Sequence, residues 1–125
     1  MILYLAADLL WASKIKGVAD ILGLPARPVR SVEMLEARLA DSPVSALLLD
    51  LDKPDEALAM LGVIAARPEG APKIRTLAFG PHVAKDLLQQ ARDAGATQVF
   101  TRGAFEHNLP DILLSLAGGA SGPAD

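Results

Sequence analysis

A chain of 125 residues has the size of one ordinary domain, and its lack of cysteine excludes disulfides, thiolate metal sites and cysteine nucleophiles. Hydrophobic residues make up 51% of the chain, which is the composition of a packed core and not of a disordered or fibrous protein. The formal net charge is −3 and no run of Lys or Arg occurs, so neither nucleic acid nor a membrane is favoured as a partner, and we expect a cytoplasmic protein without a signal peptide.

The first predicted elements are a buried strand and an amphipathic helix. Residues 2–6 form a short apolar run, which predicts the strand. Apolar side chains then follow at helical spacing on one face, at Trp11, Ile15, Val18 and Leu22. Gly23 comes directly after them, where the end of a helix favours a left-handed residue. A brief second strand is predicted over residues 26–30, and we expect it at a sheet edge because Pro28 has no N–H to donate.

The middle of the chain predicts two helices on either side of a central strand. Ser31 is a natural N-cap, and one helical face follows it at Val32, Leu35 and Leu39. Residues 44–51 are almost continuously apolar, which is typical of a parallel strand that is buried on both faces. Pro54 favours the start of the next helix, since its missing N–H is not needed in the first turn.

The last part of the chain continues the alternation. The predicted elements are a strand, a helix, a strand and a helix, at residues 74–79, 83–94, 98–101 and 110–117. We expect the first of these helices to turn Val83 inward and to end at Gly95. Residues 118–125, rich in Gly and small residues, are predicted to form a flexible C-terminal tail.

This order of elements predicts one α/β domain over residues 1–117. Strands that alternate with helices and are buried on both faces indicate a parallel sheet covered by helices on both sides. Five such strands fit a flavodoxin-like (βα)5 three-layer sandwich with the strand order 2-1-3-4-5. That order places the second strand at an edge, in agreement with Pro28. Ligands of such sheets bind at the carboxyl ends of the strands.

Two stretches at these carboxyl ends resemble a known family. In "LLLDLDKP", Asp50 ends the central strand and Pro54 follows four residues later. In "AGATQVFTR", the last predicted strand leads to Arg102. In order and spacing the two stretches resemble the signatures of response-regulator receiver (CheY-like) domains. In that family an aspartate at the end of the third strand accepts a phosphoryl group, and a lysine follows the fifth strand.

The resemblance implies a Mg²⁺ site for which this chain lacks some ligands. Receivers bind Mg²⁺ through an acidic pair at the end of the first strand, the phosphoacceptor and a backbone carbonyl two residues later, and Mg²⁺ prefers such oxygen ligands. Ala6 and Ala7 stand where the acidic pair is expected. The weak candidate ligands are Asp8, Asp50 and the Asp52 carbonyl. Asp8 either joins this site or lies exposed and caps the first helix. We expect no cofactor, and Mg²⁺ only if Asp50 is a working phosphoacceptor.

Two further positions differ from the family pattern. Ala78 is the closest match to the small hydroxyl residue that ends the fourth strand of receivers, and alanine cannot donate a hydrogen bond. Arg102 takes the place of the conserved lysine and carries its charge on a planar fork. Gly103 replaces the proline that commonly follows and is expected to lie in a loop. Sequences with such departures resemble pseudo-receivers, which keep the fold as an interaction module.

Three other side chains are candidates for interaction or for covering the site. Trp11 covers the metal position, anchors a partner or packs on the sheet. His82 is either a proton-transfer group or an ordinary loop histidine. Phe100 takes the place of the residue that changes rotamer in receivers, or simply packs. His82 and His107 do not have the spacing of metal ligands.

The first functional hypothesis is a stand-alone, non-enzymatic receiver-like signalling or scaffold domain with a degenerate Mg²⁺ and phosphorylation site. We expect it to bind a protein partner through the face formed by residues 83–94, 98–101 and 110–117, and a homodimer is left open. The alternative is a phosphoacceptor response regulator of a two-component phosphorelay, phosphorylated on Asp50. A second alternative is a flavodoxin-like domain that binds a small ligand, for which His82 and Arg102 are the available residues.

Overall fold

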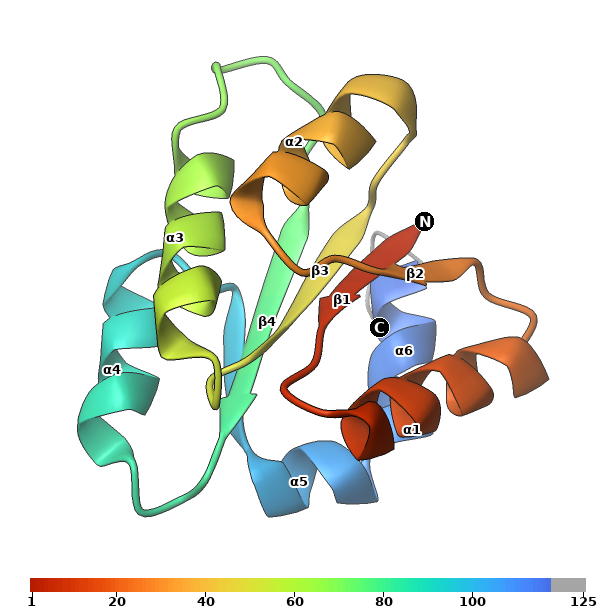
Figure 1. The fold of residues 1–125 in the computed structure, drawn as a ribbon, viewed down its shortest axis with the longest axis vertical. Coiled ribbons are helices and arrows are strands. Elements are labelled where there is room, and N and C mark those ends of the chain that lie inside the picture. The colour runs from red at the N-terminus through yellow and green to blue at the C-terminus, as the bar shows by residue number, and fades with distance from the viewer. Residues whose placement is uncertain (118–125) are drawn as a thin grey trace.

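A parallel sheet forms the middle layer of the molecule (Figure 1). The computed structural model describes residues 1–117, so the predicted tail at residues 118–125 lies outside the described residues. The strands are β1 (Ile2–Leu5), β2 (Ala26–Pro28), β3 (Ala46–Asp50), β4 (Arg75–Gly80) and β5 (Gln98–Thr101). Their order is β2-β1-β3-β4-β5, and all neighbours are parallel, which confirms the predicted topology.

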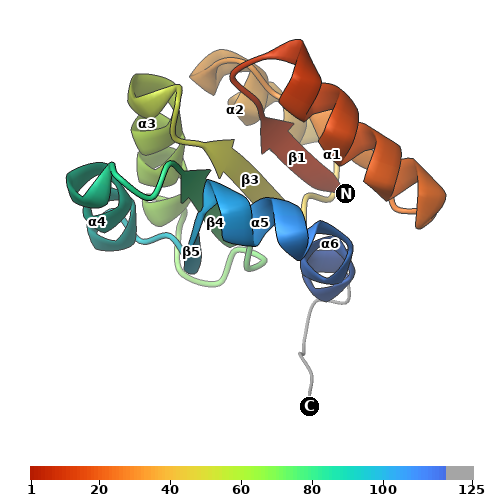
Figure 2. The same cartoon turned by 90° about the horizontal axis from the view of Figure 1, so that it is seen from below.

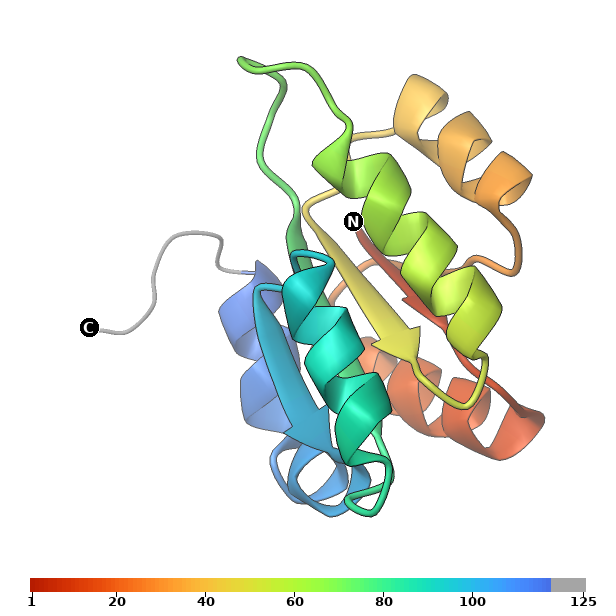
Figure 3. The ribbon, with the colours of Figure 1, turned by 90° about the vertical axis from the view of Figure 1, so that its left-hand side faces the viewer.

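Helices cover both faces of this sheet and complete the predicted three-layer sandwich (Figures 2 and 3). The helices are α1 (Leu9–Ile21), α2 (Val32–Asp41), α3 (Pro54–Ala65), α4 (Lys85–Asp93), α5 (Arg102–His107) and α6 (Leu109–Ala117). Buried side chains of α1, α5 and α6 form the core on one face, and those of α2, α3 and α4 form the core on the other. Within residues 1–117, no helix is long and apolar enough to cross a membrane.

The central strand β3 is buried along its whole length, as its apolar sequence predicts. Its side chains alternate between the two cores: Leu48 packs with α1 and α6, whereas Leu47 and Leu49 pack with α2 and α3. β2 pairs only with β1 and therefore forms an edge of the sheet, as Pro28 indicates. The end of β3 is thus held rigidly between two neighbouring strands.

The predicted helix boundaries are confirmed where capping residues define them. The Ser31 hydroxyl accepts a hydrogen bond from the Met34 N–H at 3.1 Å, and Pro54 is the first residue of α3. Gly23 and Gly95 follow α1 and α4 with φ angles of 72° and 105°, in the left-handed region that favours glycine.

The prediction for the start of α4 is wrong. The Ala84 N–H donates to the Pro81 carbonyl, so a turn comes first and the helix begins at Lys85. Val83 therefore lies outside the helix with 75% of its surface exposed, instead of pointing inward. Leu88 contributes to the buried face of the helix.

The region after β5 also differs from the prediction, because a short helix replaces the expected loop. The Thr101 hydroxyl accepts a hydrogen bond from the Ala104 N–H at 3.3 Å and caps α5 directly at the end of the strand. Gly103 consequently lies inside α5, and its φ angle is not positive. The last helix starts at Leu109, one residue before the predicted position.

An aromatic cluster fixes α5 and the start of α1 against the end of β4. The rings of Phe79 and Phe105 are stacked, with centroids 4.0 Å apart and planes inclined by 4°. The Trp11 ring lies 5.2 Å from Phe79 and 5.7 Å from Phe105, and only 7% of this residue is exposed. Trp11 therefore packs in the core and is not presented to a partner. The cluster determines where Arg102, the first residue of α5, can lie.

We predict that Phe105→Ala lowers the free energy of unfolding by about 3–5 kcal/mol, because it leaves a cavity beneath α5. Leu10→Ala is the control: Leu10 is 68% exposed, and its loss should change stability by no more than about 0.5 kcal/mol. Urea unfolding of both variants checks this prediction. Equal stabilities of the two variants would show that the cluster does not hold α5.

Candidate functional site

The carboxyl ends of the strands bring together the residues that follow β1, β3 and β5. Asp50 is the last residue of β3 and is fully buried, with 0% of its surface exposed. Its Oδ2 accepts a hydrogen bond from the Ala7 N–H at 2.9 Å, and its Oδ1 accepts one from the Asp52 N–H at 3.0 Å. Each carboxylate oxygen therefore already holds a backbone donor, and the two donors come from different loops.

Arg102 supplies a positive charge beside this carboxylate. Its Nη2 lies 3.9 Å from Asp50 Oδ1 and forms an ion pair with Asp52 Oδ2. Its Nε is buried without a hydrogen-bond partner within the part of the chain that the structure describes. The guanidinium group thus lies between the carboxylates of Asp50 and Asp52, and its place is set by the start of α5.

The electrostatics of Asp50 are dominated by its burial. Burial raises the pKa of Asp50 above its ordinary value of 3.8, because desolvation disfavours the charged form. The backbone hydrogen bonds of Asp52 and Ala7 lower the pKa again, the negative charge of Asp52 raises it, and the positive charge of Arg102 lowers it. Arg102 and the two amides thus offset part of the cost of burying the charged carboxylate, and the net shift of the pKa stays upward.

Asp8 does not join this group. Its Oδ1 accepts a hydrogen bond from the Trp11 N–H at 2.9 Å and caps α1, and the residue is exposed. Ala6 and Ala7 have no side-chain oxygen to offer. Within residues 1–117, no cluster of three or more His, Asp or Glu side chains is placed to hold a metal ion. The residues present therefore do not fit the Mg²⁺ site that the sequence resemblance implies.

The remaining candidates lie around this centre without entering it. In the sheet register Asp50 is paired with Phe79, whereas Ala78 is paired with Leu49 and packs in the core on the side of α3 and α4. Phe100 is half-buried and packs against the core that contains Phe79.

The two histidines lie on the surface. His82 is exposed in the loop between β4 and α4, and His107 is exposed at the end of α5. Neither side chain takes part in a hydrogen bond or ion pair within the described part of the chain. A proton-transfer role for His82 receives no support from these positions.

Three contributors were missed by reasoning from the sequence. Phe105 completes the aromatic cluster, and Thr101 is a residue type that favours the N-cap, which is the signal that could have predicted α5. The Ala7 N–H that binds Asp50 has no signal in the sequence, since every residue other than proline carries such a donor.

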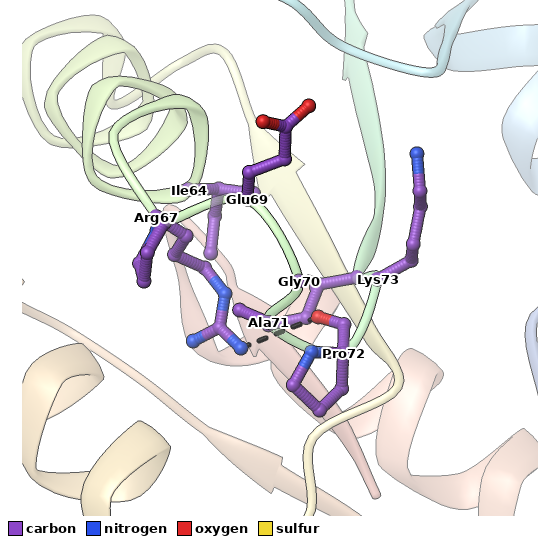
Figure 4. A pocket seen from close by; sticks show the side chains of 9 residues that line it. Ile64, Arg67, Glu69, Gly70, Ala71, Pro72 and Lys73 are labelled. Atoms are coloured by element: carbon purple, nitrogen blue, oxygen red, sulfur yellow. Dashed lines mark hydrogen bonds between the residues drawn. The ribbon is translucent and has the colours of Figure 1, made fainter.

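A cavity of about 260 Å³ lies away from this centre, at the amino-terminal end of β4 (Figure 4). The loop between α3 and β4 forms it, together with Ile64 at the end of α3. Arg67 crosses the cavity and donates a hydrogen bond to the Pro72 carbonyl at 3.2 Å. None of the candidate site residues lines the cavity, and Arg67 stabilises the loop between α3 and β4 through its hydrogen bond to Pro72.

Comparisons with known proteins agree with this architecture. No protein-family model matches the chain, and no curated protein does. The receiver domain of NtrX from Brucella abortus superposes with a TM-score of 0.75 at 16% identity, over 96% of this chain and 100% of that one. A CheY-like receiver domain from Methylobacillus flagellatus gives 0.70 at 22% identity, over 92% and 96%. The chemotaxis regulator CheY4 of Vibrio cholerae gives 0.74 at 10% identity, over 92% and 96%.

The chain has the response-regulator receiver fold. The receiver fold accounts for the place of Asp50 at the end of β3 and of Arg102 after β5. It does not account for the contacts of these residues, because identities of 10–22% show the fold alone. What the site can do must therefore be argued from Asp50, Arg102 and their neighbours.

We predict that Asp50 makes a pH-dependent contribution to stability. Because its pKa is raised, the folded protein binds this proton more tightly than the unfolded chain does. The resulting stability is fully present below the unfolded-state pKa and is lost as pH rises through the folded-state pKa. The free energy of unfolding of the wild type, minus that of Asp50→Asn, should therefore fall as pH rises above 3.8.

Arg102→Gln tests the cation in the same experiment. The positive charge of Arg102 lowers the pKa of Asp50, so its loss should raise that pKa and extend the fall in the free energy of unfolding to higher pH. Lys16→Gln, which breaks an exposed ion pair with Asp20 on α1, should leave the profile unchanged. Urea unfolding across a pH series measures all four proteins. A difference that stays flat or rises with pH contradicts the assignment.

Proposed function

We propose that this chain is a receiver-like signalling or scaffold domain that binds a protein partner and does not accept a phosphoryl group. The carrying observation is that the Asp50 carboxylate meets two backbone amides and Arg102 where a metal-binding site needs further carboxylates. The proposal includes that the domain is not an enzyme, needs no cofactor and works in the cytoplasm.

The chemistry of phosphoryl transfer supports this proposal. A carboxylate and a phosphoryl donor are both negative, so the reaction depends on a cation that neutralises charge between them. Mg²⁺ would need carboxylate ligands, and Ala6 and Ala7 provide none. Arg102 offers a single positive charge that it already shares with Asp50 and Asp52. A single cation beside two carboxyl groups leaves the site poor at attracting a negatively charged phosphoryl donor.

The proposed partner surface is formed by α4, β5 and α6. β5 is the edge strand opposite β2 and pairs only with β4, so its outer edge is open to another chain within the described structure. Val83 beside α4 is 75% exposed, and Gln98 at the start of β5 is also exposed. The exposed apolar Val83 in the loop before α4 and the unpaired outer edge of β5 suit a protein partner, which includes a second copy of the chain.

The alternative function, phosphorylation of Asp50, is supported by the aspartate itself, which keeps the receiver position at the end of β3. Arg102 also lies 3.9 Å from its Oδ1, at the position where the receiver resemblance places a cationic lysine. A direct phosphorylation experiment separates the two functions.

We predict that acetyl phosphate with Mg²⁺ leaves the intact mass of the wild type unchanged. The matched variant Ala6→Asp/Ala7→Asp/Arg102→Lys restores the receiver ligands and should gain one phosphoryl group, at least about 100-fold faster, because metal binding is worth several kcal/mol of charge stabilisation. A saturable change in Trp11 fluorescence of the wild type with beryllofluoride and Mg²⁺, abolished by Asp50→Ala, would falsify the proposal.

A second prediction concerns the partner surface. Val83→Glu/Gln98→Glu should weaken partner binding or self-association by about tenfold or more, because it places two charges on the proposed interface. Asp50→Ala removes the residue at the phosphoacceptor position and should leave partner binding and self-association unchanged. Arg27→Glu, an exposed residue of β2 at the opposite edge of the sheet, is the control for added negative charge. Sedimentation and affinity capture measure the outcome, and an effect of Asp50→Ala comparable to that of the double variant counts against the proposal.

A further inference from the structure

A cavity lined by two cationic side chains opens at the carboxyl end of β1. Its volume is about 230 Å³. The loops that follow β1, β2 and β3 converge on it and supply the lining residues Leu5, Ala6, Ala7, Asp8, Leu9, Ala12, Arg30 and Lys53. Asp50 is not among them. The cavity is therefore a neighbour of the Asp50 centre and is connected to it through Ala7, whose N–H binds the carboxylate.

The cavity exists because the residues after β1 are small. Ala6 and Ala7 fill little of the space between the β1–α1 loop and the Lys53 loop. Ala6 packs against the core, and the Ala7 backbone is fixed by its hydrogen bond to Asp50. Longer side chains at these two positions would occupy the volume. The two alanines that remove the receiver metal ligands thus also create the space.

The charged side chains that line the cavity are two cations and one carboxylate, a net charge of +1, although the chain as a whole carries −3. Arg30 and Lys53 line it, and neither forms an ion pair with any residue from 1 to 117. Asp8 is the one acidic residue of the lining, and its carboxylate is engaged by the Trp11 N–H. Arg30 and Lys53 have no ion-pair partner, and the Asp8 carboxylate already accepts a hydrogen bond, so the lining favours binding of an anion over binding of a divalent metal ion.

We propose that this cavity binds the phosphoryl group of a small ligand, either inorganic phosphate or the phosphate end of a small metabolite. A guanidinium fork matches phosphate oxygens with two parallel hydrogen bonds, and a lysine ammonium adds a point charge. Ala12 and Leu5 provide an apolar wall for carbon atoms beyond the phosphate. The inference goes beyond the proposed function and does not depend on the partner surface.

The experiment titrates the full chain with inorganic phosphate at constant ionic strength and follows the backbone amide signals of residues 6–9 by NMR. Saturable shifts with a Kd of about 1 mM or tighter are expected. A parallel titration with glycerol 3-phosphate identifies the source: tighter binding than phosphate indicates a metabolite, and weaker binding indicates the free ion. Inorganic phosphate is not a phosphoryl donor, so the result is independent of whether Asp50 can be phosphorylated.

Substitutions test the cations separately. Arg30→Gln and Lys53→Gln should each weaken phosphate binding about tenfold, the loss expected for one charge-assisted hydrogen bond. Arg27→Gln, an exposed arginine of β2 outside the lining, should leave the affinity unchanged. Asp8→Asn keeps an N-cap residue but removes the negative charge, and it should strengthen binding about two- to fivefold.

Three outcomes would overturn the proposal. The first is phosphate-induced shifts that never saturate. The second is an affinity that Arg30→Gln and Lys53→Gln leave unchanged. The third is saturable binding of Mg²⁺ alone at residues 6–9, which would assign the cavity to a metal. Thermal unfolding of each variant without phosphate confirms that a lost affinity does not reflect a lost fold.

Discussion

The buried Asp50 carboxylate needs partners, and the loops around it are arranged to supply them. A charged group without contact to water costs several kcal/mol unless hydrogen bonds and an opposite charge compensate. Here the Ala7 N–H ties the β1–α1 loop to one oxygen, and the Asp52 N–H ties the β3–α3 loop to the other. Arg102 adds the positive charge. One side chain therefore holds two loops and the start of α5 at the carboxyl edge of the sheet.

The aromatic cluster and this charged centre depend on each other. Stacking of Phe105 on Phe79 holds α5 directly behind β5, and α5 begins with Arg102. Phe79 is also the residue that pairs with Asp50 across the sheet. Arg102 is part of the chain and always supplies its positive charge to this centre, whereas a bound metal ion can dissociate.

The alanines after β1 have two consequences at once. They remove the side chains that could bind a divalent cation, and they leave a cavity whose charged lining residues are Arg30, Lys53 and Asp8. The preference of this edge of the sheet thus moves from cation toward anion, while the backbone of the receiver fold stays the same. Function in such a fold follows from the side chains at the strand ends and cannot be taken from the fold itself.

The sequence by itself determined the order of the elements, the parallel sheet and the position of Asp50, because apolar runs, helical spacing and capping residues such as Ser31 act locally. It also showed that Ala6 and Ala7 lack metal ligands. Only the tertiary structure decided that Asp8 caps α1, that Trp11 is buried and that Ala7 binds Asp50. The burial of Trp11 and the hydrogen bond between Ala7 and Asp50 depend on contacts between residues far apart in the chain, and backbone donors leave no mark in the sequence. The Asp8 cap is a local contact with Trp11, but the sequence leaves it as one of two alternatives for this side chain.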